Sequence, residues 1–150
     1  MHTIDETVLR GIVKDFLNAH HKAVFAIVDG EGLPTTSLML YVIDDDMGVY
    51  FGTRKAFKKY AHMKERPVVA LSVIEESSDP LRVVDMRGTV VELTPIEKEA
   101  AYAHFKTKNM SKYYVEGAED YVMFKLTPTF VRWLDATSGE LTITDLVLGT

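Results

Sequence analysis

The chain has 150 residues, 47% of them hydrophobic and 26% charged, which predicts one globular domain spanning residues 1–150 with a core of its own. Its formal net charge of −5 counts against a general nucleic-acid binder, and the absence of cysteine excludes disulfides, thiolate zinc sites and a cysteine nucleophile. The apolar runs are shorter than the roughly 20 residues that span a membrane, and no signal-peptide pattern opens the sequence, so we expect a cytoplasmic protein without a membrane partner.

The first predicted element is an amphipathic helix from Thr3 to His20. Its apolar residues recur every three or four positions and form one stripe, made of Ile4, Val8, Leu9, Ile12, Val13, Phe16 and Leu17. Thr3 and Glu6 have the spacing of a capping box, which predicts that the helix begins there. The stripe indicates that this helix covers a sheet.

Strand-like segments separated by turn residues make up most of the remaining sequence. These segments are KAVFAIVD (22–29), TTSLMLYVI (35–43), VYFG (49–52), VVALSVIEE (68–76), LRVVDMRGTVVEL (81–93), YVMFKL (121–126), TFVRWLDA (129–136) and ELTITDLVL (140–148). Gly88 predicts a bulge or bend within its segment, and Thr127–Pro128 predicts a break between two others. The acidic run at residues 44–46 lacks the spacing of a calcium loop and is interpreted as a turn.

The segment from Thr35 to Ile43 differs from the others because it is apolar on both faces from Leu38 onward. Such a strand needs a partner on each side. We expect a core on one face and a ligand or a second subunit on the other.

Basic residues gather between Gly48 and Arg66. The pattern predicts a strand that turns at Thr53 into a helix carrying Arg54, Lys55, Lys58, Lys59, Lys64 and Arg66, with only Glu65 opposing them. A helix start offers unpaired N–H groups and a positive dipole end, so this turn is suited to a phosphate. The alternative is a solvated cationic helix face.

A further helix is predicted from Thr94 to about Lys108, because a cap, a proline at the first position and Glu97 follow one another. Strands in hairpin succession with helices at the edges favour a mainly β fold. We predict an antiparallel barrel rather than a doubly wound sheet, since closure removes exposed strand edges.

Three pieces of the chain together resemble the pyridoxamine 5′-phosphate oxidase-like, FMN-binding split-barrel family. They are Gly32-x-Pro34-x-x-Ser37, the strand end Tyr50-Phe51-Gly52-Thr53, and Lys58-Lys59 followed by Arg66-Pro67-x-Val69-Ala70-Leu71. The resemblance is strongest from Val24 to Glu92. It implies a homodimer of split barrels, each with a six-stranded antiparallel core and peripheral helices, with two FMN molecules at the subunit interface.

The resemblance also assigns site residues. Ser37, Leu38, Met39 and Leu40 are implied to lie along the flavin ring, and Gly52, Thr53, Lys58 and Lys59 to hold the phosphate. Trp133 is a further candidate for a flavin edge across the dimer, with core or interface packing as its alternative.

The sequence departs from the family at several positions. Phe57 stands where a serine usually precedes the basic pair, and Val83 stands where a glutamine often faces the flavin. No lysine occurs in Thr35–Ile43, and no histidine follows Arg132 in an Arg-x-His element. These departures count against true pyridoxamine phosphate oxidase activity.

The expected function is therefore that of an FMN-dependent oxidoreductase acting on a small molecule. Three alternatives remain open: a split barrel that uses deazaflavin or heme, a flavin-binding sensor or stress-response protein without turnover, and an interaction domain whose basic helix recognises an acidic partner. The histidines lack a ligand spacing such as HExxH, so no metal site is predicted.

Overall fold

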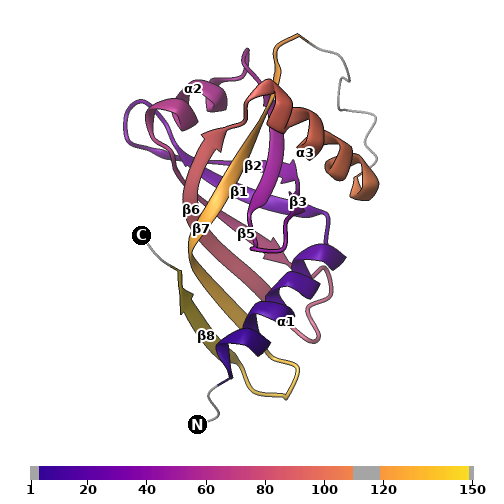
Figure 1. Ribbon diagram of the computed structural model, residues 1–150. Coiled ribbons are helices and arrows are strands. Elements are labelled where there is room, and N and C mark those ends of the chain that lie inside the picture. The colour runs from indigo at the N-terminus through magenta and orange to yellow at the C-terminus, as the bar shows by residue number, and fades with distance from the viewer. Residues whose placement is uncertain (1–3, 110–118, 149–150) are drawn as a thin grey trace.

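The computed structural model describes residues 4–109 and 119–148, in which one curled sheet is flanked by three helices (Figure 1). The helices are α1 (Glu6–Ala19), α2 (Lys58–Glu65) and α3 (Pro95–Lys108). The strands are β1 (Lys22–Val28), β2 (Pro34–Leu40), β3 (Val42–Ile43), β4 (Val49–Arg54), β5 (Val68–Ile74), β6 (Arg82–Glu92), β7 (Tyr121–Asp135) and β8 (Thr142–Val147).

All the strand pairs are antiparallel, and the sheet order is β2-β1-β5-β6-β7-β4-β3, with β8 pairing the second half of β7. The first and last strands in this order are separated in the chain only by Tyr41. The predicted strand 35–43 is thus two strands, one at each end of the sheet, and the sheet curls so that its ends meet at this residue. The structure confirms the predicted mainly β, antiparallel split barrel.

Tyr41 marks the point where β2 passes into β3. Its side chain is fully buried, and its hydroxyl donates to the Leu17 carbonyl oxygen at 2.7 Å. The Asn109 amide donates to the Tyr41 carbonyl oxygen at 2.8 Å. The bend is therefore held from α1 and from the end of α3.

Helix α1 covers one end of the barrel, as its apolar stripe predicts, and buries Leu9, Val13, Phe16 and Leu17. Its start differs from the prediction, since the helix begins at Glu6 and the cap is Asp5, whose carboxylate accepts from the Thr7 N–H at 2.9 Å. Thr3 lies outside the described residues.

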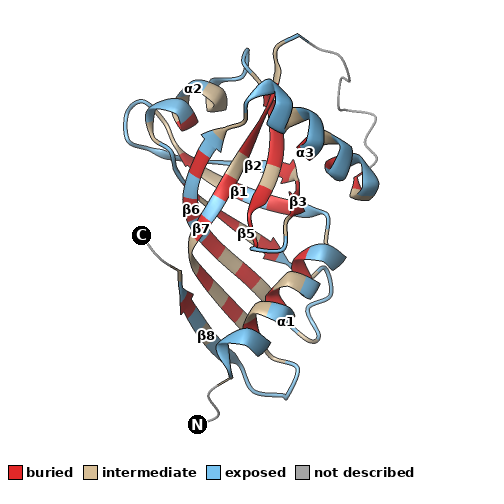
Figure 2. Ribbon diagram, viewed as in Figure 1, coloured by how far each residue is buried: buried red, intermediate tan, exposed pale blue. Residues whose placement is uncertain are grey.

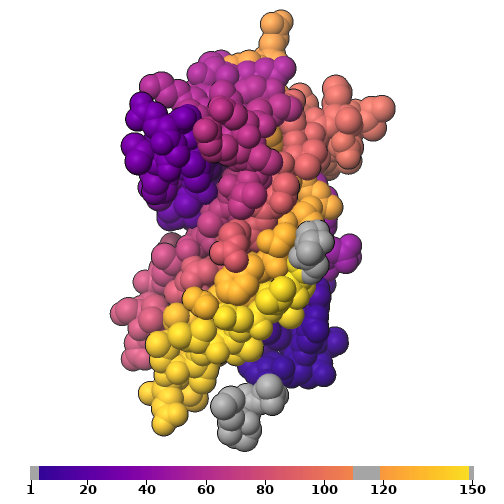
Figure 3. Space-filling model, turned by 90° about the vertical axis from the view of Figure 1, so that its left-hand side faces the viewer, coloured from indigo at the N-terminus to yellow at the C-terminus, as the bar shows by residue number. Residues whose placement is uncertain are grey.

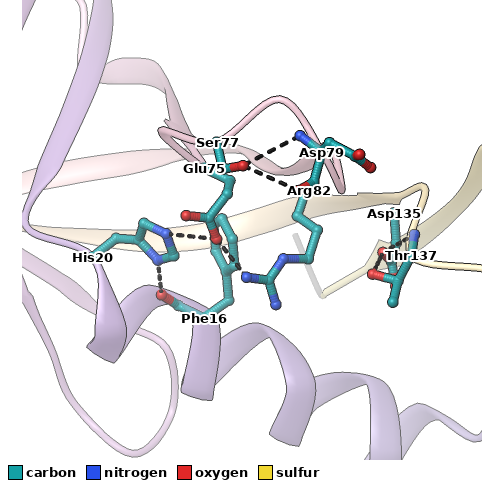
Figure 4. A network of polar contacts seen from close by, with 8 residues as sticks. All are labelled: Phe16, His20, Glu75, Ser77, Asp79, Arg82, Asp135 and Thr137. Carbon is teal, nitrogen blue, oxygen red and sulfur yellow. Dashed lines mark hydrogen bonds and ion pairs between the residues drawn. The ribbon is translucent and has the colours of Figure 1, made fainter.

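A polar network fastens the end of α1 to the hairpin between β5 and β6 (Figure 4). The His20 Nε2 lies 3.3 Å from the Glu75 carboxylate, which Arg82 also contacts, and the other ring nitrogen lies 2.6 Å from the Phe16 carbonyl oxygen. Both ring nitrogens of His20 are thus engaged within the fold.

Strand β7 is continuous from Tyr121 to Asp135, although the sequence predicted a break at Thr127–Pro128. Pro128 lies opposite Gly88, where the register between β6 and β7 shifts. A proline without an N–H is tolerated at such a bulge. A Cβ at residue 88 would lie 2.2 Å from the Thr127 carbonyl oxygen, so the close approach requires glycine. An irregularity at Gly88 was predicted and is present, with its extra residue, Thr129, in the neighbouring strand β7.

Helix α3 begins with the predicted capping box of Thr94 and Glu97 and packs on β3, β4 and β7 outside the main core. There, Ala101 and Phe105 contact a small apolar cluster containing Val42 and Met123. Buried residues alternate with less buried ones along the strands, which shows that the main core lies inside the curled sheet (Figure 2). No helix in the described part of the chain is long and apolar enough to cross a bilayer.

Candidate functional site

The passage from β4 into α2 is longer than the sequence predicted. Strand β4 continues through Arg54, a turn follows, and α2 begins at Lys58 with Phe57 as its N-cap. The cap provides no side-chain hydrogen bond, which fits the replacement of a serine by Phe57. Thr53 therefore lies within the strand and not at the start of the helix, because β4 stays paired with β7 as far as Tyr121.

The cationic cluster is smaller in the structure than in the sequence. Three of its six basic residues pair with carboxylates: Arg54 with Asp120 at 2.9 Å, Lys64 with Glu92 at 3.3 Å, and Arg66 with Glu65 at 3.3 Å. No ion pair within residues 4–109 and 119–148 joins Lys55, Lys58 or Lys59 to a carboxylate, although Lys55 lies near enough to Glu92 to help lower the pKa of that carboxyl. The positive charge available for a ligand is therefore concentrated in Lys58 and Lys59.

Lys59 and Ser37, which the resemblance assigned to the same site, are in contact. The Lys59 ammonium donates to the Ser37 hydroxyl at 3.1 Å, and burial lowers the pKa of this half-buried lysine. A neutral hydroxyl does not compensate an ammonium that has lost part of its hydration. This cation therefore favours the approach of an anion.

The Thr53 hydroxyl is a second polar group whose hydrogen bonding is incomplete. Its side chain is 4% exposed, and its hydroxyl has no hydrogen-bond partner among the described residues. Buried polar atoms in folded proteins normally have a partner, so this hydroxyl requires an explanation. The phosphate contact that the resemblance assigns to Thr53 stays a prediction.

Gly52 has a packing role that the sequence analysis missed. A Cβ at this position would lie 2.0 Å from the Tyr121 hydroxyl oxygen, so the ring of Tyr121 occupies the space that a side chain would fill. A glycine inside a strand is the available signal for such a close approach.

Strand β2 faces the core on one side and is exposed on the other. It pairs only with β1, so one edge of its backbone has no strand partner in the described part of the chain. Met39 is buried, whereas Leu38 is 64% exposed on the outer face. Leu38 lines a pocket of about 560 Å³ with Val24, Ile74 and residues around His20. Leu40 is half-buried near α3.

Trp133 is not brought together with these residues. Its indole is 3% exposed and meets the ring of Phe16 edge-on at 5.1 Å, beneath α1. Helices α1 and α2 lie at opposite ends of the barrel (Figure 1). The neighbouring Arg132 forms a two-pronged ion pair with Asp145, at 2.7 and 3.0 Å.

The site thus combines a lysine without a carboxylate partner and an exposed apolar strand edge, joined by the contact between Lys59 and Ser37. Such a combination can hold the anionic group of a ligand at α2 and a flat apolar body along β2. No group of three or more histidine, aspartate or glutamate side chains in the described residues could hold a metal ion.

Comparison with known proteins agrees with this fold. The family model described as pyridoxamine 5′-phosphate oxidase matches residues 9–134. A conserved hypothetical protein of Mycobacterium tuberculosis has a similar structure, with a TM-score of 0.76, 17% identity, and coverage of 99% of this chain and 94% of the other.

Two further solved structures are similar at low identity. A heme binding protein of Mycobacterium smegmatis has a TM-score of 0.75 and 18% identity, with 95% of this chain and 59% of the other covered. General stress protein 26 of Bacillus anthracis has a TM-score of 0.70 and 15% identity, with coverage of 93% and 98%. A search of curated protein sequences gave no significant match.

Proposed function

The chain belongs to the pyridoxamine 5′-phosphate oxidase family, and on this premise we propose that it binds FMN, with the phosphate at α2 and the ring along β2. Lys58 and Lys59 hold the phosphate, and Thr53 donates its free hydroxyl to it. Ser37 positions the Lys59 ammonium at the point where β2 reaches the phosphate site.

One observation carries this proposal: Lys59 is a half-buried cation whose partner is a neutral hydroxyl. Ion pairing with a phosphate compensates the partial loss of hydration that lowers its pKa. Burial beside a neutral acceptor also occurs at Lys108, so the phosphate interpretation is supported by the burial of Lys59 together with the adjacent Lys58 and the exposed β2 strand.

The unpaired edge of β2 supports the placement of the ring. Backbone N–H and C=O groups from Ser37 to Leu40 can contact the polar rim of the ring, while Leu38 contacts its apolar body. Bound flavin supplies hydride chemistry, and the protein orients the ring and restricts the access of water. The family resemblance further supports a homodimer with the cofactor at the subunit interface.

The substrate differs from that of the enzymes after which the family is named. Leu134 occupies the position at which an Arg-x-His element beginning at Arg132 would have its histidine. We therefore propose an oxidoreductase acting on another small molecule.

The test of the cofactor site is the Lys58→Glu/Lys59→Glu variant. Reversal of both charges is expected to weaken FMN affinity by at least about 100-fold, because two charge-assisted contacts become repulsions. Fluorescence quenching of added FMN measures the affinity, and circular dichroism checks the fold. The control is Arg10→Glu/Lys14→Glu on α1, which changes the net charge equally. Unchanged affinity in the first variant contradicts the proposal.

Turnover is tested separately, because a flavin carrier binds FMN without being an enzyme. The bound flavin is reduced under anaerobic conditions, and its reoxidation by oxygen and by a panel of small-molecule acceptors is followed by absorbance. Reoxidation over repeated cycles supports the oxidoreductase; if no acceptor reoxidises the flavin, the protein is a carrier.

Heme is a second candidate cofactor, because one structural neighbour is a heme binding protein. The absorbance spectrum of the purified protein distinguishes the two. Flavin gives a band near about 450 nm, as expected for a cofactor that carries the redox chemistry, whereas heme gives a Soret band that the Lys58→Glu/Lys59→Glu variant need not lose.

A further inference from the structure

A second hollow lies on the outer face of the sheet, beside the one that Leu38 lines. It has a volume of about 300 Å³. The residues that shape it are Ala26, Thr36, Ala70, Asp85, Arg87 and Phe130. Figure 3 looks onto this side of the molecule, where the indigo-to-purple β1–β2 hairpin stands apart from the pink β5–β6 hairpin. None of these residues was assigned to the flavin site.

The hollow arises from the sizes of residues in one row across the sheet. Pairing aligns Thr36 with Ala26, Ala26 with Ala70, Ala70 with Arg87, and Arg87 with Phe130. Two adjacent alanines make a low apolar floor, and the larger side chains at one end of the row make a wall. The floor is wide enough for a flat organic group and too apolar to hold ordered water well.

Arg87 is the cation of this hollow. Its guanidinium lies 5.0 Å from the centroid of the Phe130 ring, and it has no carboxylate partner within residues 4–109 and 119–148. Arg132 also lies over Phe130, at 5.5 Å, but its charge is compensated by Asp145. Of these two guanidiniums on the same ring, only that of Arg87 is available for an anion.

The bulge between β6 and β7 orients both walls of the hollow. The register shifts between Arg87 and Gly88, directly opposite Pro128 and Phe130. The Thr129 hydroxyl donates to the Arg87 carbonyl oxygen at 3.3 Å and helps to fix the backbone there. Bulges commonly re-aim side chains beside functional sites. The bulge here places an arginine and an aromatic ring side by side over the alanine floor.

Asp85 adds a negative charge to the hollow, so the two ends of the hollow differ in charge. It lies two residues before Arg87 on the same face of β6, and its carboxylate accepts a 2.5 Å hydrogen bond from Ser72. Asp85 also lies opposite Arg132 in the strand register and helps to raise the pKa of that guanidinium, so its charge is partly compensated. An anion is therefore attracted to the Arg87 end and more weakly repelled from the Asp85 end. A ligand must carry its acid group at one end and a neutral or hydrogen-bond-donating group at the other.

We propose that this hollow binds a flat organic anion, with its carboxylate on the Arg87 guanidinium and its ring on the alanine floor against Phe130. Val24 and Ser72 line this hollow and also the pocket that contains Leu38. The bound anion thus lies next to the ring of the cofactor. The identification of this anion as the substrate rests on the proposed function, whereas the binding of the anion to the hollow does not.

The binding test uses 4-fluorobenzoate as the probe and ¹⁹F NMR line broadening as the measurement, with 4-fluorobenzyl alcohol as the neutral control. Arg87→Gln is expected to weaken benzoate binding by at least about tenfold, which is the loss of one charge-assisted contact. The matched control is Arg132→Gln/Asp145→Asn, which removes the neighbouring guanidinium without changing the net charge and is expected to shift the affinity less than about twofold. Asp85→Asn is expected to strengthen binding.

Two results overturn the proposal: equal benzoate affinity in wild type and Arg87→Gln, or equal binding of the alcohol and the acid. Each variant is measured with and without FMN. Arg87-dependent benzoate binding in a protein that fails to bind FMN supports the anion site and contradicts the proposed cofactor. Normal FMN affinity with Arg87-independent benzoate binding supports the cofactor and contradicts the anion site.

Discussion

Two lysines, one on α2 and one on β7, show how the same residue type serves two purposes. Lys59 on α2 donates to the neutral hydroxyl of Ser37, and burial lowers its pKa. Lys125 on β7 lies 3.4 Å from the Asp44 carboxylate, which also accepts from the Tyr50 hydroxyl at 3.0 Å. Burial opposes the charge of Lys125, yet Tyr50 and Asp44 together raise its pKa.

The difference lies in whether the protein itself compensates the charge. The Asp44 carboxylate also accepts from the backbone N–H groups of Asp46 and Gly48, so it ties together the hairpin, the ring of Tyr50 and Lys125. A Cβ on Gly48 would lie 2.7 Å from both Asp44 and Lys125, which shows how closely the group is packed. The Lys125 cluster is complete and structural, whereas the Lys59 cluster lacks an anion and is suited to binding.

The largest expected effect is on cofactor affinity when each lysine is replaced by methionine. Lys59→Met is expected to weaken FMN binding by about 2 kcal/mol, or about 30-fold, since a charge-assisted contact to the phosphate is lost. Lys125→Met is expected to leave the affinity within about twofold, because its charge is already paired. Fluorescence titration measures both, and equal losses would remove the distinction between the two lysines.

Removal of the partner in each cluster is expected to affect stability in the opposite order. Asp44→Ala is expected to lower the free energy of unfolding by about 2 kcal/mol, because two turn N–H groups, Tyr50 and Lys125 lose their acceptor. Ser37→Ala is expected to lower it by about 0.5 kcal/mol or less, because the hydroxyl compensates little of the Lys59 charge. Urea denaturation provides both values, and a larger loss in Ser37→Ala contradicts the assignment.

A more conservative substitution tests whether the Asp44 cluster has a structural role only. Tyr50→Phe removes the hydroxyl that donates to Asp44 and keeps the ring, and is expected to cost about 1 kcal/mol of unfolding free energy. FMN affinity should stay at the wild-type value. A loss of FMN binding in this variant, measured by the same titration, would show that the Asp44 cluster belongs to the cofactor site.

The smallest expected effect is on how the free energy of unfolding changes with pH under alkaline conditions. Lys59 and Lys125 contribute to this change with opposite signs. A lysine with a lowered pKa in the folded state binds fewer protons than in the unfolded state between that pKa and its ordinary value of 10.5, so stability rises with pH there. The raised pKa of Lys125 makes stability fall as pH increases above 10.5. Lys59→Met should flatten the rise, and Lys125→Met should flatten the fall.

Lys108 provides a control for that measurement. It donates to the Leu17 carbonyl oxygen, and burial lowers its pKa to about 8. Its contribution to the free energy of unfolding therefore rises between about pH 8 and 10.5. The Lys108→Met variant should lose this rise. Urea denaturation across this range, with each variant compared to wild type, separates the three lysines.

Local sequence patterns predicted the features that depend on neighbouring residues. The capping box of Thr94 and Glu97 formed as expected, since cap chemistry needs only four consecutive positions. The bulge at Gly88 and the antiparallel curled sheet were also predicted correctly. The family resemblance assigned Lys59 and Ser37 to one cofactor site, but it did not predict their contact, because the two residues are 22 positions apart and give no local signal of it.

Long-range partners account for what the sequence could not predict. Half of the basic cluster is paired, and two of those carboxylates, Asp120 and Glu92, are distant in the chain from their partners. The continuity of β7 through Pro128 depends on an extra residue of β7, Thr129, lying opposite the Arg87–Gly88 step of β6. The burial of Trp133 against Phe16 depends on where α1 lies over the sheet.

The meeting of the sheet's two ends at Tyr41 has a mechanical consequence. Any displacement of β2 by a molecule lying along it passes through one residue, Tyr41, into the β3–β4 hairpin, and through the hydroxyl and the carbonyl of that residue to α1 and to the end of α3. A ligand bound along β2, at one end of the sheet, is therefore expected to affect β3, at the other end, without a hinge motion. Amide hydrogen exchange at Val42 and in the last turn of α1 should slow when FMN is added, and will not slow if the strand yields independently.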